Sequence, residues 1–409
     1  HLRLRHAAVE DGVRLIEITP ATTGLSSLAA HTELHGAGGA PAAVQAVLDA
    51  GLLGDGPVVV VLGRPSLAES ADPTVTAALA LAERPGTTFL SALRRGNVHG
   101  ALDMGLAPGV LPGRVALDGA GDALKAAWPT VPTATGLGAE AMCRAAADGA
   151  LDVLVLVGAD PLRDLPDRDL ARRALEGAGT VIAVDTFLNA SVEAADVVLP
   201  AAGFNEVDGT VTNLEARVNT VAQRVTAPGT ARPDWIIAAE LAHRLGADLG
   251  VTSVEEVLAE IEAVAPTHAG VADALVAAAG DGTVVTGTAI TPTAPAPVTL
   301  PAADSYSLRL VAGRTMFDDG TLVQRASSIA KLARPATVRL NPHEFDALGV
   351  EEGDQVKVSS ARGSITAVVR RDPGVPRGGA AIPFSAVGGA AGDLVSDGDV
   401  VTDVRVERV

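Results

Sequence analysis

The sequence predicts an α/β protein with parallel, doubly wound sheets in its first two thirds and a compact, β-barrel-like domain at its C-terminal end. Three observations predict this class. Apolar runs alternate with helical patterns in two successive sets. The composition is 48% hydrophobic but only 2% aromatic, so the cores must be aliphatic, as in proteins with Val-rich buried strands. A Pro-, Thr- and Ala-rich stretch then precedes a strand-rich end.

The first set of elements follows a β-α-β-α-β order. The run PVVVVLG is uninterrupted, which predicts a strand buried on both faces. An Ala-rich stretch before it and a second one after it are strong helix formers. The expected strands are residues 12–18, 57–63 and 87–93, and the expected helices are 38–53 and 73–84.

The second set begins with a strand that runs into a tight turn and continues with a helix that ends at glycine. Two further apolar runs complete an α/β set that again favours a parallel sheet. The expected strands are residues 152–161, 180–187 and 195–201, and the expected helix is 166–179.

Residues 232–246 predict one more helix. Pro233 and Asp234 fall in its first turn and Gly246 lies just past its end, which is the usual asymmetry of helix termini. Trp235, Ala239, Ala242 and Leu245 share one face at helical spacing.

The last part of the chain changes in composition and in residue pattern. Residues 283–304 have the composition of an extended, semi-rigid linker. Residues 337–371 then read as strand, short helix, turn, strand, turn and strand, with residues 361–363 joining the last two strands. This pattern predicts a compact β-barrel-like domain.

Charge and cysteine content exclude several functions. A formal net charge of -18 and few aromatic side chains disfavour nucleic-acid binding. The single cysteine, Cys143, excludes an internal disulfide and a cysteine-ligated metal centre within this chain. No apolar run approaches the ~20 residues that span a bilayer. The first residues lack an apolar signal-peptide region and an initiator Met, so we expect a fragment or a processed piece of a longer protein.

Isolated reactive side chains are few. His31 and His35 are four residues apart, so on a helix they would share a face, but a third metal ligand is missing. We expect a solvated surface pair. Cys143 lies in an Ala-rich stretch and is expected to be a buried, inert side chain. No known catalytic motif is present.

The ends of two predicted strands carry polar residues. Gly158, Asp160 and Pro161 follow one strand, and Asp185 ends the next. In doubly wound sheets, nucleotides bind at this rim, where an acid can accept hydrogen bonds from a ribose or a guanine edge. The alternative is that both acids merely cap helices.

The stretch 194–217 combines a buried strand with a polar segment. Asp208, Gly209 and Thr210 read as a turn, and Asn213 and Arg217 follow in a loop too polar for a core. The Arg217 guanidinium has the shape to bind a carboxylate or a phosphate. Such a loop either binds a polar ligand or ties two domains together, and nothing local separates these options.

Three stretches together resemble the molybdopterin-dependent oxidoreductases, the superfamily of formate dehydrogenases and periplasmic nitrate reductases. They are residues 94–113, residues 194–217 with 227–246, and residues 341–365. Their order and separation also match. The resemblance implies an α/β fold of Rossmann-like parallel-sheet units followed by a double-psi β-barrel. The corresponding division is 1–93, 94–265, a linker at 266–305, and the barrel at 306–409.

Within that superfamily, the chain resembles the large peripheral-arm subunits of bacterial NADH:quinone oxidoreductase (respiratory complex I), which are called G subunits. The resemblance implies iron–sulfur clusters in a missing N-terminal portion and a body that has lost its molybdenum cofactor. Ala216 replaces one of two adjacent arginines of the active enzymes, His99 replaces a common Gln, and Asp318 and Asp319 would oppose a pyrophosphate.

The favoured hypothesis is therefore a structural body, without catalytic residues, that contacts other peripheral-arm subunits on the cytoplasmic face of the plasma membrane. It is expected to hold no cofactor, to insert nothing into the membrane and to bind no nucleic acid. The alternatives are a fragment of an active molybdenum enzyme, such as a formate dehydrogenase with molybdopterin guanine dinucleotide, and a free-standing nucleotide-binding module. The vestigial cofactor-binding candidates are Gly158, Asp160, Pro161, Asp185, Asp208, Gly209, Asn213 and Arg217.

Overall fold

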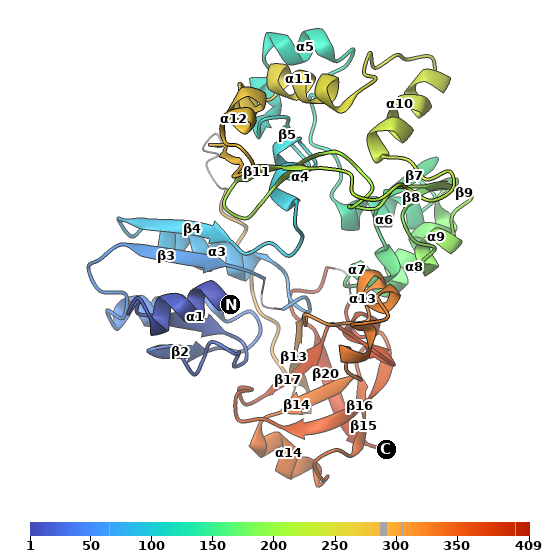
Figure 1. Ribbon diagram of the computed structural model, residues 1–409. Coiled ribbons are helices and arrows are strands. Elements are labelled where there is room, and N and C mark those ends of the chain that lie inside the picture. Colours follow the sequence, from blue (N-terminus) through green and yellow to red (C-terminus); the bar gives the residue numbers. More distant parts are fainter. Residues whose placement is uncertain (65, 287–292, 305, 397) are drawn as a thin grey trace. The chain divides into compact units, whose positions relative to one another are not determined.

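The computed structural model describes residues 1–64, 66–286, 293–304, 306–396 and 398–409 (Figure 1). The chain divides into two compact units, each made of segments that are discontinuous in sequence. Unit 1 comprises His1–Phe89, Pro161–Ala171 and Thr293–Val409, and unit 2 comprises Leu90–Asp160 and Arg172–Pro292. The four sequence ranges proposed above stay a prediction.

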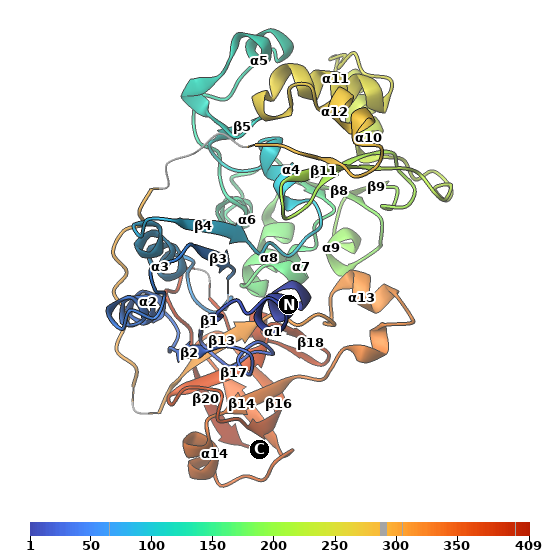
Figure 2. The same cartoon turned by 60° about the vertical axis from the view of Figure 1, so that its left-hand side comes forward.

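The N-terminal part of unit 1 pairs short strands with two helices. The strands β1 and β2 run parallel, and β3 and β4 form a separate two-stranded sheet. Helices α2 and α3 lie side by side (Figure 2) and bury Val44 against Leu81. The elements are α1 (Leu2–Val9), β1 (Ile16–Thr19), β2 (His31–Leu34), α2 (Ala40–Asp49), β3 (Val58–Leu62), α3 (Asp72–Ala82) and β4 (Thr87–Ser91).

Two expectations for this region are corrected. The run at 57–63 does form a strand, but it is not buried on both faces, because Val59 and Val61 are 65% and 39% exposed. The expected solvated surface pair of His31 and His35 is also wrong: His31 begins strand β2, and His35 is buried at the end of that strand.

The C-terminal part of unit 1 is a closed barrel of six strands in the order β13-β17-β14-β16-β15-β20. Alternate residues along the strands point inward, so Val338, Leu340, Val356 and Val358 are fully buried in one aliphatic core. The barrel elements are β13 (Leu308–Gly313), β14 (Thr337–Leu340), α14 (Pro342–Leu348), β15 (Gln355–Ser359), β16 (Ser364–Arg371), β17 (Gly379–Pro383) and β20 (Asp403–Arg408).

The barrel connections explain the predicted pattern of strand, helix and turn. The Asn341 side chain accepts a hydrogen bond from the His343 amide at 3.0 Å and begins α14, and Gly349, at φ 65°, ends it. The barrel-like domain expected from the sequence is confirmed. The shorter elements are α13 (Thr321–Arg325), η3 (Ala330–Leu332), β18 (Ser385–Ala386), β19 (Gly389–Ala390) and η4 (Ala391–Asp393).

A parallel sheet of three strands, in the order β7-β8-β9, is the centre of one part of unit 2. Its strands fall where the apolar runs predicted them. Gly179 allows close packing, since a Cβ there would lie 2.7 Å from the Asp152 carbonyl oxygen. The sheet and the helices near it in sequence are α6 (Ala139–Ala147), β7 (Val153–Val157), α7 (Pro161–Asp164), α8 (Arg168–Gly177), β8 (Thr180–Asp185), α9 (Ala190–Glu193), β9 (Val197–Pro200) and α10 (Asp234–Arg244).

Helix α10 forms as predicted but buries a different face. Ile237 and Leu241 pack against Val184 and Ala201, whereas Leu245 is 85% exposed. Leu245 is the C-cap residue, one position past the end of α10, and so lies beyond the part of the helix that packs on this core.

The rest of unit 2 contains short helices and an antiparallel hairpin. Two small cores form here, one around Leu111 and Leu124 and one around Val218 and Val271. The elements are α4 (Val98–Asp103), β5 (Val110–Leu111), β6 (Val115–Ala116), η1 (Leu117–Gly119), α5 (Asp122–Ala127), β10 (Gly209–Thr212), β11 (Arg217–Val221), α11 (Val254–Val264), η2 (Pro266–His268), α12 (Val271–Ala277) and β12 (Thr283–Val284).

The range proposed as a linker, 266–305, therefore carries η2, α12 and β12 in its first part. Residues 287–292 and 305 of that range lie outside the described residues. Among the helices of the described chain, none is both long and apolar enough to cross a bilayer.

Candidate functional site

The carboxyl ends of β7 and β8 bring the predicted rim residues of unit 2 together, as expected for neighbouring parallel strands. Gly158, at φ 57°, donates its amide to the Val184 carbonyl at 2.8 Å. Asp160 is 7% exposed, and its Oδ1 accepts a hydrogen bond from Ser191 Oγ at 2.6 Å. Pro161 follows directly as the first residue of α7 and is buried.

Asp185 orders the turn after β8. Its Oδ1 accepts from the Phe187 amide at 3.0 Å, and its Oδ2 accepts from Asn189 Nδ2 at 3.3 Å. Asn189 in turn caps α9 by accepting from the Val192 amide at 3.0 Å. Asp185 therefore orders the turn after β8, while Asn189 supplies the helix cap, and a role of Asp160 and Asp185 toward a ligand stays a prediction.

The polar segment expected as a turn and loop is a β-hairpin. Gly209 and Thr210 lie in β10, and Arg217 begins β11. At the tip, Asn213 Oδ1 accepts from the amides of Glu215 at 2.8 Å and Arg217 at 3.0 Å. Ala216 completes the turn in the left-handed region, at φ 58°.

Arg217 and Asp208 are also bonded within unit 2. Arg217 Nη1 donates to the carbonyl oxygens of Gly282 at 3.1 Å and Asp281 at 3.4 Å. Asp208 Oδ1 accepts from the Gln223 amide at 2.9 Å. The hairpin is thus joined to the segment that precedes β12.

A buried polar network, which the sequence did not predict, lies in the 94–113 stretch. Arg114 Nε donates to Asp103 Oδ1, and Arg114 Nη2 lies 2.8 Å from His99 Nδ1. Asp103 is only 3% exposed. Asn97, from the same stretch, accepts from the Thr212 amide of the hairpin at 2.7 Å. In the sequence, the 94–113 motif was the feature that pointed to this region, and Arg114 lies one residue beyond it.

Two histidines adjoin this network, and the pKa of each is lowered. Burial, reinforced by the positive Arg114, lowers the pKa of His99, against the opposing effect of Asp103. Burial also lowers the pKa of His268, which is 5% exposed, and there Asp103 opposes the shift.

His31, His35 and Cys143, the isolated reactive residues of the sequence, are not part of a metal site among the described residues. Cys143 is buried on α6, as predicted. The described residues contain no group of three or more His, Cys, Asp or Glu side chains placed to hold a metal ion.

The fold and these motifs define the class of protein. Residues 25–244 match the family described as Molybdopterin oxidoreductase, and residues 308–404 match the Molydopterin dinucleotide binding domain. The chain therefore belongs to the molybdopterin oxidoreductase family, and the resemblance inferred from its motifs is confirmed.

Two relatives show which kinds of subunit this chain is similar to. The chain is 33% identical over 377 residues to the G subunit of NADH-quinone oxidoreductase from Mycobacterium bovis, and the match covers 89% of this chain and 44% of that protein. It is 32% identical over 326 residues to the alpha subunit of F420-dependent formate dehydrogenase 2 from Methanococcus maripaludis, covering 72% of this chain and 47% of that protein. The chain thus spans less than half the length of these two relatives.

Solved structures support the fold. Acetylene hydratase from Pelobacter acetylenicus superposes with a TM-score of 0.59 over 98% of this chain and 75% of that one, at 14% identity. The predicted combination of parallel sheets with a C-terminal barrel is confirmed.

The family match implies a molybdopterin dinucleotide, and the candidate residues do not fit one. Arg217 is the only cation among the eight candidates, and its Nη1 is directed at two backbone carbonyls. The carboxylates of Asp160, Asp185 and Asp208 already accept hydrogen bonds within the chain, and their charge repels a pyrophosphate.

Proposed function

We propose that this chain is the cofactor-free structural body of the large peripheral-arm subunit, or G subunit, of an NADH:quinone oxidoreductase. In this role it holds other peripheral-arm subunits in position at the cytoplasmic face of the membrane and performs no chemistry itself. Electrons pass through iron–sulfur clusters in a portion of the protein outside this chain. The observation that carries the proposal is that Asp208, Asn213 and Arg217 of the polar segment are bonded to backbone groups of unit 2.

Two further features support the proposal. The relative from NADH-quinone oxidoreductase aligns with 89% of this chain, a larger share than the formate dehydrogenase relative, at similar identity. The Ala- and Val-rich cores favour a rigid framework, since these side chains lose little conformational entropy when they are buried.

A second candidate is the C-terminal portion of an active molybdenum enzyme of the formate dehydrogenase type. It is favoured by the 32% identity to the formate dehydrogenase alpha subunit and by the match to a dinucleotide-binding domain. Under this alternative the hairpin and the rim of the parallel sheet would bind molybdopterin guanine dinucleotide.

The molybdenum and pterin content of the full-length protein, purified from its own source, distinguishes the two functions. Elemental analysis counts the metal, and fluorescence after oxidation detects the pterin. We expect iron without molybdenum or pterin. Stoichiometric molybdenum together with pterin would overturn the structural role and establish the second candidate.

A further inference from the structure

Segment 161–169 of unit 1, which contains α7 and the start of α8, forms a chain of ion pairs with the barrel. Arg163 Nη1 lies 2.6 Å from Asp319 Oδ2 and also donates to the Asp319 carbonyl oxygen. Arg314 donates to the Asp164 carbonyl at 3.1 Å and lies 3.6 Å from its Oδ1. Both partners on the barrel lie in the region that follows β13.

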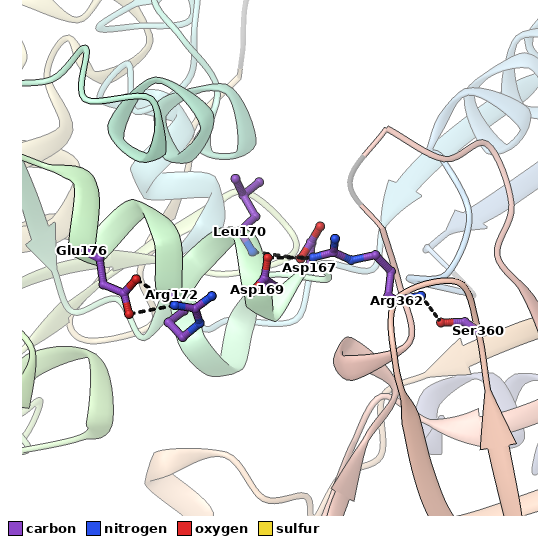
Figure 3. A network of polar contacts seen from close by, with 7 residues as sticks. All are labelled: Asp167, Asp169, Leu170, Arg172, Glu176, Ser360 and Arg362. Atoms are coloured by element: carbon purple, nitrogen blue, oxygen red, sulfur yellow. Dashed lines mark hydrogen bonds and ion pairs between the residues drawn. The ribbon is translucent and has the colours of Figure 1, made fainter.

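The start of α8 makes the second half of this contact (Figure 3). Arg362 Nη2 lies 2.9 Å from Asp169 Oδ2 and 3.4 Å from Asp167 Oδ1. Arg168 Nη1 lies 3.2 Å from Asp393 Oδ1. On the barrel the charges of the paired residues alternate along the chain, and the segment contributes two arginines and three aspartates to these pairs.

The geometry of Arg362 is fixed by the turn that carries it. The turn joins β15 to β16, and Ser360 Oγ accepts from the Arg362 amide at 3.0 Å (Figure 3). On the other side, Asp167 Oδ1 also accepts from the Leu170 amide at 2.9 Å, so it caps α8 while it faces Arg362. Hydrogen bonds to the backbone therefore order both the turn that carries Arg362 and the helix start that carries Asp167.

The backbones also approach closely. A Cβ on Gly392 would lie 3.2 Å from the Pro166 carbonyl oxygen. The Arg314 guanidinium stacks on the Phe384 ring, 4.5 Å from its centroid, which orients the guanidinium between the ring and Asp164. The contact therefore combines close backbone packing with ion pairs.

In the ion pairs that the described residues form here, each arginine faces a carboxylate. The arginines are Arg163, Arg168, Arg314 and Arg362, and the carboxylates are those of Asp164, Asp167, Asp169, Asp319 and Asp393. A diphosphate is bound by guanidinium groups through paired, charge-assisted hydrogen bonds. Arg314 and Arg362 both lie on the barrel side of this contact, and carboxylates of the segment pair with both.

We propose that segment 161–169 acts as an internal anion that takes the place of a diphosphate on the barrel, with Asp164, Asp167 and Asp169 occupying Arg314 and Arg362. This inference rests on the proposed cofactor-free function and gives it a physical cause. A dinucleotide would have to displace carboxylates that are covalently tethered beside their partners, and tethering gives them a high effective concentration.

The test removes the three carboxylates in the complete 409-residue chain. The variant Asp164→Asn/Asp167→Asn/Asp169→Asn keeps the side-chain volumes, and Asn retains the cap that begins α8. The matched control is Glu176→Gln, because Glu176 lies on the same helix but pairs with Arg172 at 2.7 Å (Figure 3). Inorganic pyrophosphate and GDP are titrated separately by calorimetry at low ionic strength, where charge pairs are least screened.

We expect no measurable heat with the wild type or the control. The triple variant should bind both probes at least roughly tenfold more tightly than the wild type, the effect of one charge-assisted hydrogen bond. Circular dichroism checks the fold, and Asp169→Asn alone is the milder variant, since its carboxylate is already 41% exposed. It should show a smaller gain in the same direction.

The contrary outcomes separate the two proposals. A folded triple variant without any gain, or with a gain equalled by Glu176→Gln, overturns the internal anion alone. Wild-type chain that binds GDP as tightly as the triple variant overturns it too. Molybdenum and pterin in the full-length protein overturn the proposed function, whichever way the titration turns out.

Discussion

Replacing Asn213 by Ala should destabilise unit 2 measurably. The substitution removes the acceptor of two backbone hydrogen bonds, from the Glu215 amide at 2.8 Å and the Arg217 amide at 3.0 Å. A net contribution of about 1 kcal/mol per bond, lowered by the solvent exposure of the turn, predicts a loss of about 1–2 kcal/mol. Ala216 makes the turn more dependent on these two hydrogen bonds, because a residue other than glycine is strained in the left-handed region.

Equilibrium urea unfolding followed by tryptophan fluorescence measures this loss. Both tryptophans, Trp128 and Trp235, belong to unit 2, so the signal does not come from the barrel. Asn213→Asp is the control, because it keeps an acceptor oxygen in the same position and should lose less than half as much. Equal losses for the two variants, or an unchanged midpoint for Asn213→Ala, would refute the reasoning that the hairpin is held by its own side chain.

Four further outcomes are expected. Arg217→Ala should lower the yield of assembled complex more than the turnover of each assembled complex, as measured by native electrophoresis and NADH oxidation, because its guanidinium joins the hairpin to residues 281–282. Gly113→Ala should cost about 2 kcal/mol or more in urea unfolding, since its φ is 80° and a Cβ would lie 2.5 Å from Pro266 Cδ. The unfolding free energy of unit 2 should fall as the pH drops below 6.5, because the lowered pKa of His268 leaves the unfolded chain with more bound protons, and His268→Gln should weaken this dependence. Cys143 should react with a thiol reagent only on unfolding.

The apolar runs predicted the strands of unit 2 because burial determines them. The predicted strand at 180–187 contains β8, Thr180–Asp185, and the predicted helix at 166–179 contains α8. In both places the hydrophobic period agrees with the tertiary structure, and glycine ends the helix, so local and global preferences coincide.

The polar hairpin was misread for an identifiable reason. Asp208, Asn213 and Arg217 suggested a turn and a loop, but Val211 lies in β10 and Val218 in β11, two short paired strands. Val218 is almost fully buried, and the polar side chains satisfy the backbone at the tip. Composition alone does not separate a polar loop from a hairpin whose polar groups bond their own backbone.

The ion pairs between segment 161–169 and the barrel lie beyond any local sequence argument. Arg163 and Asp319 are 156 positions apart, and Arg362 and Asp169 are 193 apart. The sequence indicated only that Asp319 would oppose a pyrophosphate. In the structure, Asp319 pairs with Arg163, a partner that the sequence did not indicate.

An acidic chain can use its excess of carboxylates in two ways. As a distributed net charge of -18, they repel polyanions over about a Debye length, and salt screens that effect. Placed against Arg314 and Arg362, they neutralise individual cations at contact distance, where salt screens them less. Only the second arrangement depends on position, so under the proposed internal anion a few well-placed aspartates, rather than a more acidic surface, would keep a dinucleotide off the barrel.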